Sequence, residues 1–150
     1  MLETAPDIEN IKKLAQQLPE KIPHLKMLVL FGSKATGNAN NRSDWDFAVL
    51  YDRKQENNDT KAWGRFDLSM LLGEVLGINP EKIDIVELNH CSWLISHFVA
   101  RDGILIFEKD RYGFEYFRLT CLKSESELKK FREEQHKLIA IDLNNWSKST

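Results

Sequence analysis

The stretch of residues 30–52, LFGSKATGNANNRSDWDFAVLYD, decides how this chain can fold. An apolar run ends at Gly32 and Ser33, and ten residues later Asp44 and Asp46 flank a tryptophan at the start of a second apolar run. Both runs have the length and composition of buried strands. Two carboxylates at such a place repel each other, and burial adds to the cost of their charge. The spacing therefore calls for a positively charged ligand between them.

The alternation of side chains along a strand puts Asp44 and Asp46 on one face and the apolar residues Trp45, Phe47 and Val49 on the other. Residues two apart lie about 6.6 Å apart along a strand, so the two carboxylates can converge on one point. Mg²⁺ prefers hard oxygen ligands and usually combines one or two carboxylates with phosphate oxygens. The pair predicts a metal site for a phosphorylated substrate. An exposed strand start, at which Asp44 only caps a turn, is the alternative.

The residues that follow the first apolar run suit a phosphate. Gly32 permits a tight turn and a close approach of the backbone to a ligand. If a helix begins at Ser33, its first amide groups favour an anion, and the hydroxyl adds a donor. Lys34 either adds positive charge there or lies in solvent, and Gly37 is expected to end this short helical turn. A plain strand-to-helix turn would also use a Gly-Ser pair.

A third carboxylate lies within another apolar run, because Asp84 stands between Ile83 and Ile85. An aspartate inside a strand is costly without a partner. If this strand lies beside the one that carries Asp46, the three carboxylates can surround two divalent ions, as in the two-metal scheme for nucleotidyl transfer. The alternative is a surface aspartate at a strand end.

The rest of the chain predicts an α/β or α+β domain with one small sheet. Helical periodicity covers residues 7–18 and ends at Pro19 and Pro23, and a second helix over 61–76 follows Thr60 and stops at Gly77. Further helices are expected over 92–103 and over 112–146, with a break near 124–126. Strands are expected over 26–31, 44–51, 82–88 and 104–107. The polar segment 52–59 reads as a solvated loop.

Bulk composition limits the class of protein. A chain of 150 residues with 42% hydrophobic residues fits one domain over 1–150. Its net charge of −2 argues against a protein whose main task is to bind nucleic acid. The two cysteines, Cys91 and Cys121, are expected to be free thiols. Since no signal peptide and no membrane span is found, we expect a soluble cytoplasmic protein.

The Gly-Ser pair, the ten-residue spacing, the Asp-x-Asp and the later strand aspartate resemble the nucleotidyltransferase fold of the DNA polymerase beta superfamily. The compact length resembles its minimal nucleotidyltransferase branch, and VARDGILIFEKD at 99–110 resembles that branch's passage from helix to strand. The resemblance covers essentially the whole chain. It implies a small mixed sheet flanked by helices, with about 110–150 as a C-terminal helical extension of the same domain.

The resemblance also implies a function. Gly32, Ser33 and Lys34 would hold the triphosphate of ATP, Asp44 and Asp46 would bind Mg²⁺, and Asp84 would be the third acid. Many members of this branch are antitoxins that transfer AMP to a tyrosine of a HEPN-domain ribonuclease toxin. Two alternatives stay open, namely neutralisation of the partner by binding alone and transfer to a small molecule such as an aminoglycoside.

One further stretch has two interpretations. The segment YGFEYFRLTCL at 112–122 is rich in aromatic residues, which suits either core packing or a surface that binds a partner protein.

Overall fold

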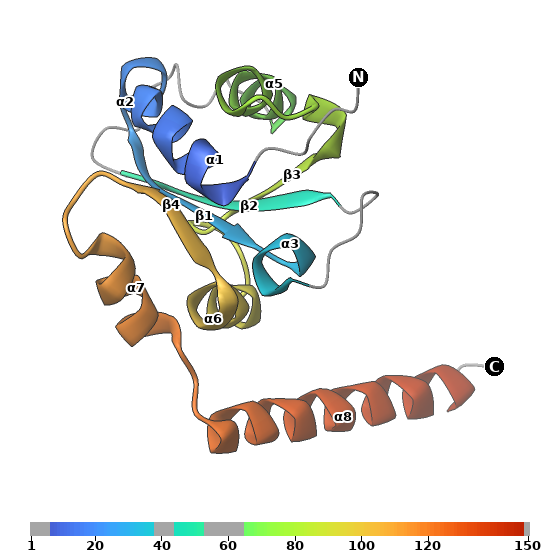
Figure 1. The fold of residues 1–150 in the computed structure, drawn as a ribbon. Helices are drawn as coiled ribbons and strands as arrows, with labels where there is room; N and C mark the ends of the chain where they lie inside the picture. Colours follow the sequence, from blue (N-terminus) through green and yellow to red (C-terminus); the bar gives the residue numbers. More distant parts are fainter. Residues whose placement is uncertain (1–6, 38–43, 53–64, 149–150) are drawn as a thin grey trace.

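A computed structural model describes residues 7–37, 44–52 and 65–148. Figure 1 shows a sheet with helices on both faces and a long helix that extends away from them. The elements in chain order are α1 (Ile8–Leu14), η1 (Ala15–Gln17), α2 (Leu18–Lys21), β1 (Leu25–Phe31), α3 (Ser33–Thr36), β2 (Trp45–Tyr51), α5 (Arg65–Leu76), η3 (Pro80–Lys82), β3 (Ile83–Glu87), α6 (Trp93–Asp102), β4 (Ile104–Glu108), α7 (Gly113–Cys121) and α8 (Glu125–Lys148).

The sheet has four strands in the order β3-β2-β1-β4. Strand β1 pairs antiparallel with both β2 and β4, whereas β2 and β3 run parallel. The sheet is therefore mixed, as expected from the resemblance. The condition stated for Asp84, that its strand lies beside the strand of Asp46, is met.

Two apolar cores lie on opposite faces of the sheet. Phe47 and Val49 of β2 are fully buried in the first core, where they pack with residues of α1, α2 and α5. Ala48 lies between them in the chain and belongs to the second core, together with residues of α6 and α7. Trp45 is 7% exposed and joins the first core. The predicted alternation of β2 is therefore confirmed, and Asp46 shares a face with Ala48 because the two are two residues apart.

The first helical segment differs from its prediction at Pro19. The sequence suggested that the helix ends there, but Pro19 occupies the first turn of α2, and the chain stays helical to Lys21. Proline suits this position because the first amides of a helix have no intrahelical acceptor. The predicted end at Pro19 is wrong, since η1 joins α1 to α2 without interruption.

Several predicted boundaries are confirmed by their caps. The Ser92 hydroxyl accepts a hydrogen bond from the Ile95 amide at 3.3 Å and so opens α6, which ends at Gly103. Gly77 follows α5 with a φ of +72°. Thr60, the first residues of the predicted helix over 61–76 and most of the 52–59 loop lie outside the described residues.

The C-terminal helices separate at residues 122–124, close to the predicted break. His97 of α6 is 2% exposed, and its Nδ1 accepts a hydrogen bond from the Lys123 amide at 2.9 Å. Trp93 of α6 packs edge-on against Phe131 of α8, with ring centroids 4.4 Å apart. These contacts fix the start of α8 against α6, and Figure 1 shows the remainder of α8 projecting beyond the sheet.

Cys91 and Cys121 are both free thiols, as expected. None of the helices in the described part of the chain combines the length and the apolar character that crossing a membrane requires.

Candidate active site

The backbone at Gly32 brings the end of β1 against Asp46. Phe31 is the ladder partner of Asp46, so Gly32 follows directly beside that carboxylate. Gly32 has a φ of +77°, which side chains other than hydrogen disfavour. A Cβ atom at this position would collide with the Asp46 carboxylate. Glycine is therefore required here both by the backbone conformation and by the space that the carboxylate occupies.

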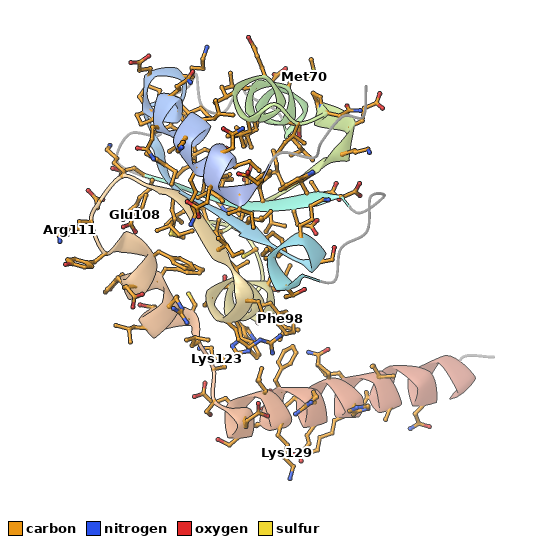
Figure 2. The ribbon with its side chains drawn as sticks, in the orientation of Figure 1. Met70, Phe98, Glu108, Arg111, Lys123 and Lys129 are labelled. Atoms are coloured by element: carbon orange, nitrogen blue, oxygen red, sulfur yellow. The ribbon has the colours of Figure 1, made fainter. Side chains whose placement is uncertain are left out.

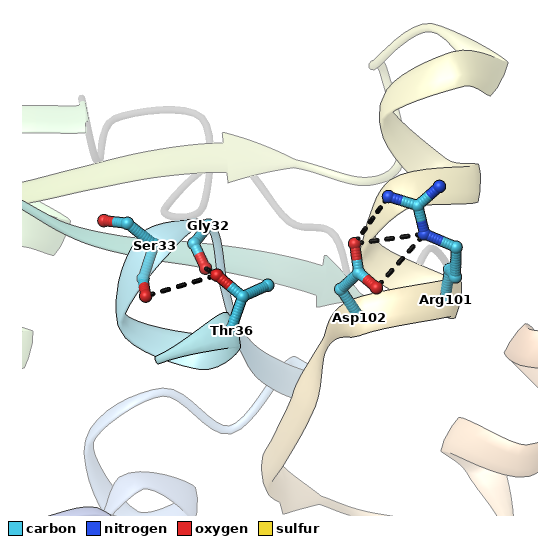
Figure 3. A network of polar contacts seen from close by, with 5 residues as sticks. All are labelled: Gly32, Ser33, Thr36, Arg101 and Asp102. Atoms are coloured by element: carbon cyan, nitrogen blue, oxygen red, sulfur yellow. Dashed lines mark hydrogen bonds and ion pairs between the residues drawn. The ribbon is translucent and has the colours of Figure 1, made fainter. Parts of the chain in front are cut away.

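The turn after Gly32 is a single helical turn, α3, that ends at Gly37 with a φ of +81°. The Ala35 and Thr36 amides donate to the Gly32 carbonyl at 3.1 and 3.2 Å. The Thr36 hydroxyl also lies 3.4 Å from the carbonyl oxygens of Gly32 and Ser33 (Figure 3). The role of Gly37 is thus confirmed, while the contribution of Thr36 was not foreseen, because its contacts depend on the shape of the turn.

The two strand aspartates face each other across neighbouring strands. Asp46 of β2 is the register partner of Asp84 of β3 in the parallel pair. Neighbouring strands lie about 4.8 Å apart, and register partners project to the same face. Asp44 precedes β2 and is exposed, as is Asp84, whereas Asp46 is half-buried. The structure therefore brings Asp84 beside Asp46, as the sequence required for a shared site, with Asp44 at the entrance to β2.

The electrostatics of Asp46 reflect this crowding. Burial raises the pKa of its carboxyl above the ordinary value, and the negative charges of Asp84 and then Asp44 raise it further. No basic side chain is among the causes of the shift. A carboxylate in such surroundings gains from a cation, because the cation offsets both the repulsion and the loss of hydration.

A metal ion fits these residues only in part. Within residues 7–37, 44–52 and 65–148, no group of three or more His, Cys, Asp or Glu side chains is arranged to hold a metal by itself. The pair formed by Asp46 and Asp84 fits a cation of the Mg²⁺ type, which usually takes few carboxylates and completes its shell with phosphate oxygens and water. The three-carboxylate, two-metal arrangement stays a prediction.

Lys34 is held by a contact that the sequence did not reveal. Its Nζ atom lies 4.6 Å from the centroid of the Trp45 ring, a distance typical of a cation–π interaction. Trp45 was predicted only as a core residue, and it contributes to the core as well. Because the contact joins α3 to β2, no local signal in the sequence could have found it. The contact holds the cation at the start of β2 over a ring of the first core, whereas Asp46 lies on the face of Ala48.

The chain matches a family model and a curated relative over most of its length. The family model described as "Polymerase beta, Nucleotidyltransferase" matches residues 9–112. A curated relative, the protein adenylyltransferase MntA of Aphanizomenon flos-aquae (strain 2012/KM1/D3), is 48% identical over 151 residues, which cover 97% of this chain and 99% of that protein. This chain belongs to the polymerase beta nucleotidyltransferases, in the protein adenylyltransferase branch. It is a nucleotidyltransferase, and assignment of residues 113–150 to the same domain stays a prediction.

Solved structures share the fold of this family. A chain of a toxin–antitoxin crystal structure with AMP-PNP matches with a TM-score of 0.59 at 24% identity, covering 91% of this chain and 98% of that one. A chain from a structure of a tri-AMPylated Shewanella oneidensis HEPN toxin in complex with an MNT antitoxin matches with a TM-score of 0.56 at 23% identity, covering 90% and 97%. At these identities the likeness establishes the fold alone.

Proposed function

We propose that this chain is an antitoxin that transfers AMP from ATP to a tyrosine of a cognate HEPN ribonuclease toxin and thereby neutralises it. The observation that carries the proposal is the pairing of Asp46 with Asp84 beside the Gly32 turn, in a chain 48% identical to a protein adenylyltransferase over nearly its whole length. The solved complex of a tri-AMPylated HEPN toxin with an MNT antitoxin supports the choice of partner. We assign the reaction to the cytoplasm, where ATP is available.

The residues around Gly32 would receive the triphosphate. The backbone of Gly32 can approach a ligand closely, because glycine has no side chain. The α3 turn offers the Ser33 hydroxyl and the first amides of the helix, which act as individual donors because one turn has little dipole of its own. Lys34, the residue after Ser33, would add a positive charge on leaving its contact with the Trp45 ring. Together these groups would bind and orient the substrate.

The carboxylates would supply the metal site and the base. Asp44, Asp46 and Asp84 would hold Mg²⁺, which would neutralise charge on the phosphates and polarise them when bound. Asp84, exposed at the start of β3, would accept the proton of the tyrosine hydroxyl. The new bond forms between the tyrosine oxygen and the α-phosphorus of ATP, the bond from this phosphorus to the bridging oxygen breaks, and diphosphate leaves. Docking of a protein acceptor provides the orientation that in-line attack requires.

Co-expression with the toxin tests the proposal. The cognate HEPN-type protein, purified after co-expression, is expected to be heavier by one or more AMP units in intact mass spectrometry, with the modification on a tyrosine. The Asp44→Asn/Asp46→Asn double variant should give toxin of unmodified mass. The exposed Asp67 of α5 provides the control, because Asp67→Asn removes a carboxylate outside the site and should leave the modification unchanged.

Neutralisation by binding alone is the competing outcome of the same experiment. If the toxin emerges unmodified but inactive, and the double variant protects cells as well as the original chain does, the protein acts by occlusion. Modified toxin that is inactive after separation from the antitoxin would instead support AMP transfer as the cause.

A further inference from the structure

Exposed apolar side chains are concentrated in the C-terminal part of the chain. Among the described residues ten large apolar side chains are exposed, and nine of them lie between residues 93 and 141. The exception is Met70 on α5, which is 48% exposed. Single exposed apolar residues need no explanation, but a concentration of them indicates a surface that another molecule covers.

Helix α7 has apolar residues on both sides. Phe114 and Phe117 face inward and are 8% and 9% exposed, within the second core. Tyr112, Tyr116 and Leu119 are 62%, 74% and 81% exposed. Their spacing of four and then three residues puts them along one side of a helix. We call this set, together with Leu122 after the helix, the α7 outer face. The helix also carries Glu115, which is exposed, and Arg118, which is half-buried, so its outer side combines apolar and charged side chains.

The start of this face has an unfavourable backbone. Tyr112 is the only residue other than glycine with a positive φ in the described part of the chain, at +67°. Such conformations are disfavoured for side chains like tyrosine and are found preferentially where function requires them. The Arg111 guanidinium lies 5.0 Å from the centroid of the Tyr112 ring. Figure 2 shows Arg111 at the outside of the molecule, beside the start of α7.

The segment 109–124 that carries the α7 outer face is basic, although the chain as a whole carries −2 and Glu108, Glu125 and Glu127 adjoin the segment. Residues 109–124 contain four basic and two acidic side chains, a net charge of +2. Arg118 is engaged within the fold, since its Nε donates to the Ala100 carbonyl at 3.0 Å and its Nη1 lies 3.8 Å from Glu115. Lys123 rests 5.8 Å from the Trp93 ring centroid. An acidic partner surface would complement Arg111 and Lys123.

The position of α7 relative to the family model indicates the kind of partner. The general nucleotidyltransferase model ends at residue 112, immediately before α7. The protein adenylyltransferase relative, in contrast, aligns over 97% of the chain and so includes most of the segment after it. Apart from Tyr112, the α7 outer face therefore lies beyond the general model and within the length that aligns with a protein-modifying relative. The feature that distinguishes such enzymes is a protein acceptor.

We propose that the α7 outer face is the docking surface for the acceptor protein, and that this protein presents an apolar patch bordered by carboxylates. The proposal rests on the proposed function, because it takes the HEPN toxin as the occupant. Tyr112 and Tyr116 serve as anchors, since large aromatic residues supply much of the binding energy of protein interfaces. Arg111 and Lys123 favour the acidic border and exclude partners of positive charge.

Binding and transfer are measured separately to test this surface. Binding is measured by calorimetry with purified HEPN toxin in the Asp46→Asn background, so that the toxin stays unmodified. Adding Tyr116→Ser/Leu119→Ser is expected to weaken the affinity about tenfold or more. Met70→Ser, which removes an exposed apolar side chain from α5, is the control and should leave the affinity within about twofold. Arg111→Glu should weaken binding most at low salt, because screening reduces the interaction between exposed charges.

Transfer kinetics in the catalytically intact chain provide the second measurement. The Tyr116→Ser/Leu119→Ser variant is expected to raise KM for the toxin while kcat at saturation stays unchanged, because α7 does not contact the reacting atoms. Unchanged affinity and unchanged KM would overturn the docking surface even if AMP transfer is observed. Toxin that binds through this face but is never modified would uphold the surface and refute the proposed transfer.

A second copy of this chain is the competing occupant. Light scattering of the chain alone distinguishes the two. If the chain is a dimer that Tyr116→Ser/Leu119→Ser converts to a monomer while toxin affinity is unchanged, the face is a homodimer interface, and the proposal is wrong. A chain whose mass is the same with and without the substitutions, combined with reduced toxin affinity, supports it.

Discussion

Gly32 and Asp46 depend on each other through the ladder that pairs Phe31 with Asp46. The glycine leaves the space that the carboxylate fills, and the carboxylate in turn lies against the backbone that would approach a phosphate. Both residues could be identified from their spacing in the sequence, since the chemistry of a strand aspartate near a glycine turn is local. The contact between Lys34 and Trp45 could not, because it requires the pairing of β1 with β2.

The effect of a substitution at Gly32 has two parts, namely backbone strain and collision with the Asp46 carboxylate. Gly32→Ala is expected to lower the free energy of unfolding and to abolish nucleotidyl transfer, since the new methyl group displaces Asp46. Gly77→Ala is the matched control, because Gly77 has a φ of +72° but open space around its Cβ position. It should cost only the backbone strain, roughly 1–2 kcal/mol. Denaturant unfolding and a labelled-ATP transfer assay measure both. Equal effects of the two substitutions on transfer would contradict the assigned contact.

Asp46 makes the metal-free protein less stable at neutral pH. Because the pKa of its carboxyl is higher in the folded protein than the value of 3.8 expected when unfolded, the folded state binds the proton more tightly. Stability from this group is therefore present below that value and is lost as the pH rises through the folded pKa. Asp46→Asn should raise the melting temperature in EDTA at pH 7 and reduce the loss of stability with rising pH. The same substitution should abolish nucleotidyl transfer.

Mg²⁺ provides the check on this interpretation. Added Mg²⁺ with ATP should raise the melting temperature of the original chain more than that of Asp46→Asn, since the variant lacks a charged ligand. Asp67→Asn, on the surface of α5, should behave as the original chain does. A variant that melts lower than the original chain in EDTA would show that Asp46 stabilises the apo fold, against the stated cause.

Ser33 is expected to act on the substrate and not on the fold. Ser33→Ala removes a donor to a charged phosphate group, a loss of roughly 1.5–3 kcal/mol, or about ten- to a hundredfold in kcat/KM. Steady-state kinetics with ATP as the varied substrate measure the change, and Ser126→Ala on α8 is a control at an exposed serine. Unaltered kinetics would mean that Ser33 serves only the turn.

At the scale of elements, helix ends with local signals were predicted from the sequence, whereas of the strand pairings only the β2–β3 neighbourhood was considered. Ser92 and Gly77 mark helix ends by their own chemistry, and the sequence located both. The placement of β4 beside β1 depends on contacts across some eighty residues, which no periodicity encodes. Pro19 misled because proline ends one helix and begins another with equal ease, and only the packing of α2 decides between them.

The connection between α7 and α8 is held by a hydrogen bond to His97. Its Nδ1 is the acceptor for the Lys123 amide, so a neutral imidazole with the proton on Nε2 is required. His97→Leu should leave this amide without its acceptor and destabilise the chain by about 1–3 kcal/mol. Hydrogen exchange at residues 122–124 should then be faster. His97→Asn, whose amide oxygen can accept in the same direction, should restore part of the protection, and His136→Leu on exposed α8 should have no such effect.

At the scale of the whole molecule, catalysis and docking are assigned to different elements. The assigned phosphate and metal residues lie in or beside α3, β2 and β3, whereas the α7 outer face lies, apart from Tyr112, beyond the family model. The sequence identified the first group through a motif. For the aromatic segment at 112–122 it left core packing and partner binding open. Core packing is confirmed for Phe114 and Phe117, which are buried, while Tyr112 and Tyr116 are exposed and partner binding there stays a proposal.

This separation predicts that metal removal affects one process and not the other. With EDTA in excess, AMP transfer to the toxin should fall to background, because the carboxylates Asp44, Asp46 and Asp84 then lack the cation that neutralises the phosphates. The complex with the toxin should persist in size-exclusion chromatography, since Tyr116 and Leu119 need no metal to pack against a partner. Restored Mg²⁺ should restore the mass gain of the toxin within the same complex. If EDTA instead dissociates the complex, the metal site and the docking surface are coupled, and the toxin must bind at the aspartates themselves.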